Sequence, residues 1–141
     1  MRTKIILITL FAIAMGYMES AVVVYLREII YPMGFTFPLA SVQEHLAITE
    51  IIREAATLIM LFSIAFLAGG YFTERFAWFL YSFAIWDIFY YVFLKVLTGW
   101  PESLFTWDIL FLIPVSWVGP VIAPIIVSVS MILLSSGIIS Y

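Results

Sequence analysis

Cysteine is absent from the 141-residue chain, and histidine occurs only once, at His45. A chain without cysteine forms no disulfide, no thiolate-ligated iron–sulfur cluster and no cysteine-based active site. A single histidine also excludes a haem held by two histidines of one chain. We therefore predict neither haem nor an iron–sulfur cluster as a cofactor.

Charged side chains are scarce as well. They make up 11% of the sequence, with six Lys and Arg against nine Asp and Glu, which gives a net charge of −3. Proteins that bind nucleic acid usually carry a basic patch or stripe. Because this chain is acidic and has no run of basic residues, we predict that nucleic acid is not a partner.

Apolar residues dominate the chain. Hydrophobic residues account for 65% of it and aromatic residues for 18%, and the mean hydropathy is +1.17. Soluble domains are about half apolar and about a quarter charged. A core of this size cannot hide so much apolar surface, so we predict an all-α integral membrane protein of one domain, surrounded by the lipid bilayer.

Prolines and glycines divide the apolar sequence into segments. Breaks occur at 31–38, which contains two prolines, at the pair Gly69 and Gly70, and at TGWPES, residues 98–103. Segment 104–113 is too short to span a bilayer, and we interpret it as a half-helix at the interface. The prediction is a four-helix up-down bundle with this half-helix before the last span. The predicted membrane helices cover residues 5–30, 39–68, 75–97 and 119–140.

The few basic residues predict an orientation. Arg2 and Lys4 precede the first span, and Arg75 lies at the turn between the second and third. The other two connections contain no Lys or Arg. Because cytoplasmic loops carry an excess of these residues, both termini are predicted to lie in the cytoplasm.

Several ionisable residues lie inside the predicted spans at a shared depth. At about 1.5 Å of rise per residue, Glu19, Glu54 and Asp87 lie roughly 18–22 Å from the cytoplasmic helix ends. Glu50 and Arg53 lie in the same layer or one turn above it. Polar side chains are costly on a lipid-facing surface, so these faces are expected to turn inward and line a cavity in the outer half of the bilayer.

This layer is unbalanced in charge, because it holds four carboxyl groups against one guanidinium group. Burying such an excess is costly, so either carboxyl groups are protonated or a cation is bound. Our leading hypothesis is a cation site, above all for a divalent metal ion, which carboxylate oxygens suit. The predicted ligands are Glu19, Glu50, Glu54 and Asp87, with Arg53 as their ion-pair partner.

Two further sets of residues are predicted around this site. Tyr90 and Tyr91 follow Asp87 by about one turn, and we expect them to donate hydrogen bonds into the cavity. A group of mostly charged side chains lies nearer the outer surface and is expected to form the cavity mouth. It comprises Arg27, Glu28, His45, Lys95 and Asp108.

A second hypothesis is an acid/base pocket for a lipophilic small molecule. A protonated carboxyl group beside an ionised one, in a dry pocket with aromatic walls, suits proton transfer. Those walls would come from Tyr25, Trp86, Tyr90 and Tyr91. In outline this arrangement resembles the small sterol-isomerase and sigma-2-like membrane proteins, whose buried acids lie among aromatic residues. The likeness is one of architecture, which implies an isomerase-like activity.

Transport and a purely structural role are the third and fourth hypotheses for the same residues. Acids at mid-depth are typical of proton or cation transporters, although alternating access with only four helices would require a homodimer. In a structural role, Arg53 would pair with Glu19 or Asp87 to fix the helix register of an accessory subunit. The unequal number of acidic and basic groups in the layer argues against this last role.

Overall fold

The computed structural model describes residues 1–113 and 115–141. In that part of the chain, four helices are each long and apolar enough to cross a membrane. The mainly helical fold and its four membrane-length helices are therefore confirmed, and they support an integral membrane protein. The helices are α1 (Arg2–Ile30), α2 (Glu44–Ala68), α3 (Phe72–Thr98) and α4 (Ile122–Ile139).

One helix end follows from the local sequence, and one helix start differs from its prediction. The third helix, α3, ends at Gly99, whose φ of 77° is a left-handed conformation that glycine adopts without strain. The second helix, α2, begins at Glu44 rather than at the predicted residue 39. Residues 39–43 belong to the α1–α2 connection instead. In that connection, the backbone N–H of Ala40 donates a hydrogen bond to the hydroxyl of Tyr31 at 2.8 Å.

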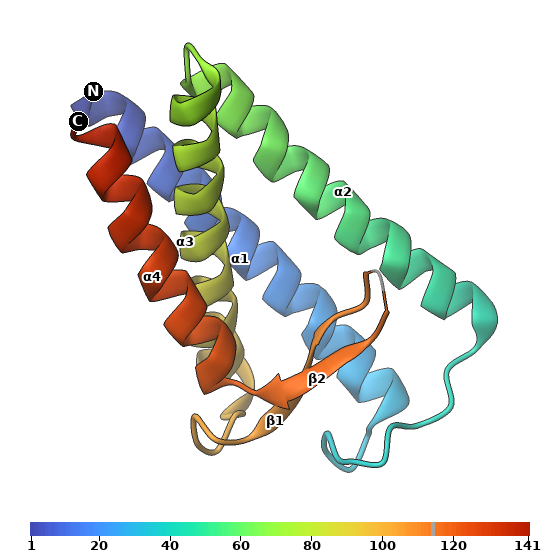
Figure 1. Cartoon of the computed structure of the whole chain (residues 1–141). Coiled ribbons are helices and arrows are strands. Elements are labelled where there is room, and N and C mark those ends of the chain that lie inside the picture. The colour runs from blue at the N-terminus through green and yellow to red at the C-terminus, as the bar shows by residue number, and fades with distance from the viewer. Residues whose placement is uncertain (114) are drawn as a thin grey trace.

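The central element is α3, which packs against each of the other three helices. It lies close to α1 at Gly16, where an added Cβ would be 3.1 Å from both the carbonyl oxygen of Trp86 and the backbone nitrogen of Tyr90. Figure 1 shows both termini at one end of the molecule and the α1–α2 connection at the other. The C-terminal half of α1 therefore lies at the same end of the molecule as the N-terminal half of α2.

A β-hairpin occupies the region before α4, so the predicted half-helix over 104–113 is wrong. Strand β1 (Trp107–Phe111) pairs antiparallel with β2 (Trp117–Pro120), with Asp108 opposite Gly119. A short apolar run has no periodicity that separates a strand from a buried helical turn. The hairpin lies at the end of the molecule opposite the termini, beside the ends of α1 and α3 (Figure 1).

Gly16→Val is expected to lower stability by roughly 1–3 kcal/mol, because the new side chain would overpack the contact between α1 and α3. The measurement is the thermal unfolding midpoint of the purified protein in detergent. Gly137→Val in α4 is the matched control, since nothing lies within 4 Å of a Cβ built there. Equal unfolding midpoints for the two variants would contradict the close approach at Gly16.

Candidate functional site

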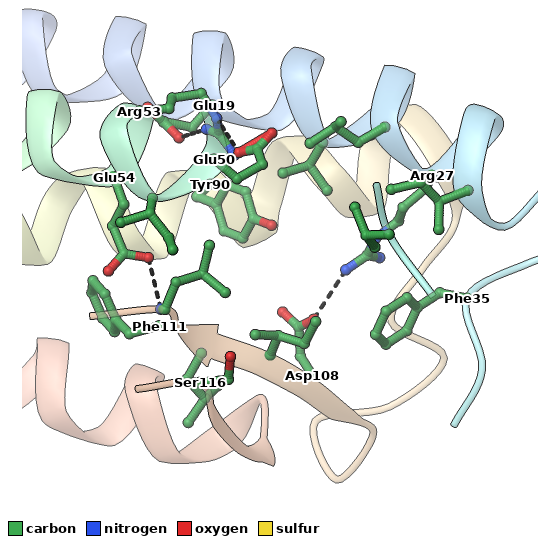
Figure 2. A pocket seen from close by; sticks show the side chains of 18 of the residues that line it. Glu19, Arg27, Phe35, Glu50, Arg53, Glu54, Tyr90, Asp108, Phe111 and Ser116 are labelled. Atoms are coloured by element: carbon green, nitrogen blue, oxygen red, sulfur yellow. Dashed lines mark hydrogen bonds and ion pairs between the residues drawn. The ribbon is translucent and has the colours of Figure 1, made fainter. Parts of the chain in front are cut away.

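A cavity of about 390 Å³ lies between the helices and the hairpin. Its walls come from the second half of α1, the first half of α2, the middle of α3 and both the hairpin and the α1–α2 connection. Among the described residues, α1 and α2 approach each other closely at few positions, although both pack on α3. The space between them is the interior that Figure 2 shows.

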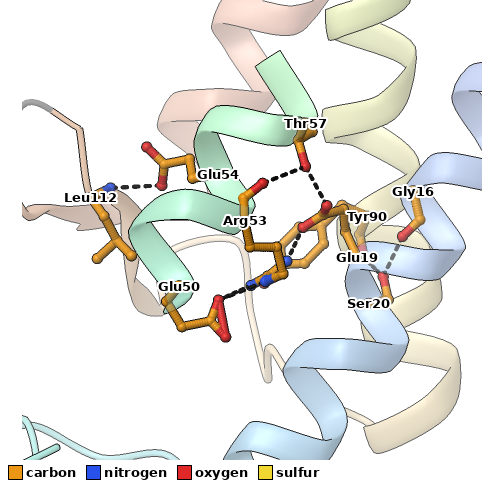
Figure 3. Close-up of polar contacts among 9 residues, drawn as sticks. All are labelled: Gly16, Glu19, Ser20, Glu50, Arg53, Glu54, Thr57, Tyr90 and Leu112. Carbon is orange, nitrogen blue, oxygen red and sulfur yellow. Dashed lines mark hydrogen bonds and ion pairs between the residues drawn. The ribbon is translucent and has the colours of Figure 1, made fainter. Parts of the chain in front are cut away.

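An ion-pair cluster joins α1 to α2 across this space. Arg53 pairs with Glu19 of α1 and with Glu50 of its own helix, and its Nε lies 2.6 Å from the Glu50 carboxylate. The hydroxyl of Thr57 donates to the other oxygen of Glu19 at 2.5 Å. Figure 3 shows the four side chains converging from the two helices. Hydrogen bonds to ionised groups are about twice as strong as neutral ones, so this cluster holds α1 and α2 together.

Glu54 uses its carboxylate in a different way. Its two oxygens accept hydrogen bonds from the backbone N–H groups of Leu112 and Ile113, at 2.8 and 2.9 Å. These amides follow β1, and lipid could not satisfy them. The carboxylate of Glu54 therefore fastens the hairpin to α2, as Figures 2 and 3 show.

Asp108 fastens the hairpin to α1 and α3. Its carboxylate is almost fully buried, and it accepts hydrogen bonds from Arg27 at 3.0 Å and from the Tyr91 hydroxyl at 2.9 Å. The Arg27 guanidinium also lies 4.3 Å from the ring centre of Phe35 and 4.0 Å from that of Trp100. Burial raises the pKa of Asp108, while the Arg27 charge and the Tyr91 hydrogen bond act to lower it.

Asp87 is the buried carboxyl group of α3 that lines the cavity. One of its oxygens accepts a hydrogen bond from the Ser128 hydroxyl of α4, at 2.8 Å. Among the described residues, no Lys or Arg forms an ion pair with it. Asp87 therefore keeps a carboxyl group in the cavity wall with a neutral partner only.

Most of the predicted site residues line the cavity, but three do not. Glu28 and His45 lie outside it, and Lys95 donates to the carbonyl oxygens of Gly99 and Pro101 at the end of α3, both at 2.8 Å. The Tyr91 hydroxyl donates a hydrogen bond to Asp108, whereas Tyr90 lines the cavity. The predicted residues that line the cavity are Glu19, Arg27, Glu50, Arg53, Glu54, Asp87, Tyr90, Tyr91 and Asp108.

The predicted metal ligands are not gathered around one point. Across residues 1–113 and 115–141, no three His, Asp or Glu side chains are placed so that they could hold a metal ion. The physical reason is that Glu54 turns to the hairpin amides and Asp87 to Ser128, while Glu19 and Glu50 share Arg53. The arrangement gives the four-carboxylate metal site no support.

Sequence reasoning missed several partners of these groups. The amides of Leu112 and Ile113 carry no signal, since any residue other than proline supplies a backbone N–H. In the sequence, Ser128 indicates only a small packing residue, although a hydroxyl group in a membrane helix needs a partner. Phe35 and Trp100 come from two connections whose proximity the sequence did not indicate.

Comparisons of the chain with protein-family models, with curated proteins and with solved structures find no match. Function depends on the residues of a site rather than on a fold. The cavity and its polar groups therefore provide the basis for the function proposed below.

Glu54→Gln is expected to speed hydrogen exchange at Leu112 and Ile113. The substitution replaces one acceptor oxygen by an NH₂ group, so one hairpin amide loses its partner, at a cost of about 1–3 kcal/mol. Exchange of the peptide that spans the hairpin, followed by mass spectrometry, is the measurement. Glu102→Gln removes the same charge at an exposed position and serves as the control. If both variants exchange like the wild type, Glu54 is not the hairpin anchor.

Arg27→Met is expected to destabilise the protein by roughly 3–5 kcal/mol, because it leaves the buried Asp108 carboxylate without its cation. Methionine keeps apolar bulk beside the rings of Phe35 and Trp100. Adding Asp108→Asn removes the unpaired charge and should recover part of the lost stability in thermal unfolding. A double variant no more stable than Arg27→Met alone would contradict this pairing.

Proposed function

We propose that this integral membrane protein binds, in its cavity, a lipophilic small molecule that carries a positively charged or proton-accepting group. The observation that carries the proposal is the charge of the lining, which has five carboxyl groups against two guanidinium groups. Both guanidinium groups are already paired, to Glu19, Glu50 and Asp108. The lining therefore favours a ligand that brings positive charge or accepts a proton.

The walls between the charged groups favour an organic ligand. Apolar side chains line the cavity on several sides, among them Val23 and Leu26 of α1, Ile51 of α2 and Phe111 of the hairpin. Binding sites for small molecules typically enclose about 300–1,000 Å³, with mostly apolar walls and a few polar groups. The cavity has this size and this mixture, and its aromatic faces suit a cation as well.

The rest of the molecule favours a binding site over a transport path. The half of the bundle nearer the termini is filled by a core that includes Ile8, Ala65 and Trp78. A proton or ion path would need a continuous run of polar groups or water at that depth, whereas Thr9 and Tyr81 in this half bond to each other. An acid/base reaction on the bound molecule, of the isomerase-like kind, would use the same cavity and the same carboxyl groups.

The proposal includes a topology in the membrane. The helices would cross in alternating directions, as an up-down bundle, with both termini in the cytoplasm. Two features support this orientation: the termini share one end of the molecule (Figure 1), and Arg2, Lys4 and Arg75 belong to that end by their place in the chain. The cavity would then lie in the outer half of the bilayer.

Dicyclohexylamine and dicyclohexylmethane test the proposal as a matched pair of probes. The amine is positively charged at pH 7, as alkylamines are, and the hydrocarbon has the same shape without charge. The amine should raise the thermal unfolding midpoint of the purified protein more than the hydrocarbon does, with about 2.7 kcal/mol of stabilisation at ~100 times its Kd. A midpoint raised by Mn²⁺ and not by the amine would contradict an organic ligand.

Asp87→Asn should reduce the shift caused by dicyclohexylamine, because it removes a carboxyl group that has no cation partner among the described residues. Asparagine keeps an acceptor for Ser128, so the fold should be retained. Glu28→Gln removes a charge of the same sign outside the cavity and should leave the shift unchanged. Equal shifts in the wild type and both variants would place amine binding elsewhere.

A further inference from the structure

Tyr90 has a polar group without a partner in the cavity wall. Among residues 1–113 and 115–141, its backbone carbonyl accepts a hydrogen bond from Ser20, but its hydroxyl makes none. Figure 2 shows this hydroxyl directed into the open centre of the cavity, between the Arg53 cluster and Asp108. The group therefore faces the space that a ligand would fill.

Two other tyrosines inside the bundle have hydroxyl groups that form hydrogen bonds within the protein. The hydroxyl of Tyr91 donates to Asp108 at 2.9 Å, and that of Tyr81 bonds Thr9 at 2.6 Å. At the cavity rim, the hydroxyl of Tyr31 accepts from the Ala40 backbone. Polar groups inside proteins normally bond to protein or to water, and the Tyr90 hydroxyl is open to the cavity without a partner among the described residues. For Tyr90, that partner has to come from inside the cavity.

The charged groups nearest to Tyr90 have other partners. Arg53 is held between Glu19 and Glu50, and the Asp108 carboxylate accepts from Arg27 and Tyr91. A phenolic hydroxyl can donate one hydrogen bond, and this proton is unused. The complementary group is thus a hydrogen-bond acceptor on an apolar molecule.

We propose that Tyr90 donates a hydrogen bond from Oη to a carbonyl or hydroxyl oxygen of the ligand. Tyr90 is then a specificity residue, whereas its neighbour Tyr91 is a structural residue that holds the hairpin. The ligand class narrows to a lipophilic molecule with an oxygen acceptor. This inference rests on the proposed function, since it requires an organic ligand in the cavity.

The test uses dicyclohexyl ketone, which has a carbonyl group in place of the central CH₂ group of dicyclohexylmethane. The wild type should bind the ketone more tightly than the hydrocarbon, and Tyr90→Phe should lose this preference, with ketone affinity weakened about 5- to 10-fold. Binding is measured by calorimetric titration of the full-length protein in detergent micelles. Tyr90→Phe should unfold at the wild-type temperature, because the hydroxyl has no bond to lose among the described residues.

Tyr81→Phe is the matched control on the same helix. It removes the hydrogen bond to Thr9 and should lower the unfolding midpoint, yet it should leave the ketone affinity unchanged, because Tyr81 does not line the cavity. This opposite pattern in the two variants separates a ligand contact from a general loss of stability.

Three outcomes would overturn the inference. Equal ketone affinity in the wild type and Tyr90→Phe would show that the hydroxyl does not contact the ligand. A ketone that binds no better than the hydrocarbon would show that water satisfies Tyr90. In both cases, binding of dicyclohexylamine would leave the proposed function intact. If neither the amine nor the ketone binds, the proposed function fails together with the inference.

Discussion

The cavity depends on the Arg53 guanidinium, which is shared between Glu19 and Glu50. Helices α1 and α2 both pack on α3, but their described residues approach each other closely at few positions. The bonds from Arg53 and Thr57 to Glu19 cross this space and fix its width. In a medium of low dielectric constant such bonds are strong when every member has a partner, so a few side chains can hold two helices apart and in register.

The hairpin closes the same space, and two carboxylates hold it from opposite directions. Glu54 extends from α2 to the hairpin backbone, and Asp108 extends from the hairpin to Arg27 and Tyr91. Non-helical backbone is tolerated at membrane depth where it lines a cavity, and residues of strand β1 line this one. If the proposed function holds, structure and binding use the same acids, and their number reflects both requirements.

The sequence predicted the helices well and the site in part. Composition alone predicts membrane-spanning helices, and prolines and glycines mark where they end, so the four helices could be found. The hairpin could not be found, because Asp108 and Gly119 pair across a loop that no periodicity marks. Without the hairpin, the acids looked unsatisfied and suggested a metal ion. Tyr90 and Tyr91, about 100° apart on a helix, could not be assigned to separate roles for the same reason.

The central claim is that the excess of carboxyl groups serves an organic ligand. The most direct measurement is an experimental density map of the cavity, in protein purified from its own membranes without added ligands. The account predicts elongated density that follows the apolar walls and lies within hydrogen-bond reach of Tyr90. A compact peak coordinated by oxygens of Glu19, Glu54 and Asp87 would contradict it and restore the metal site.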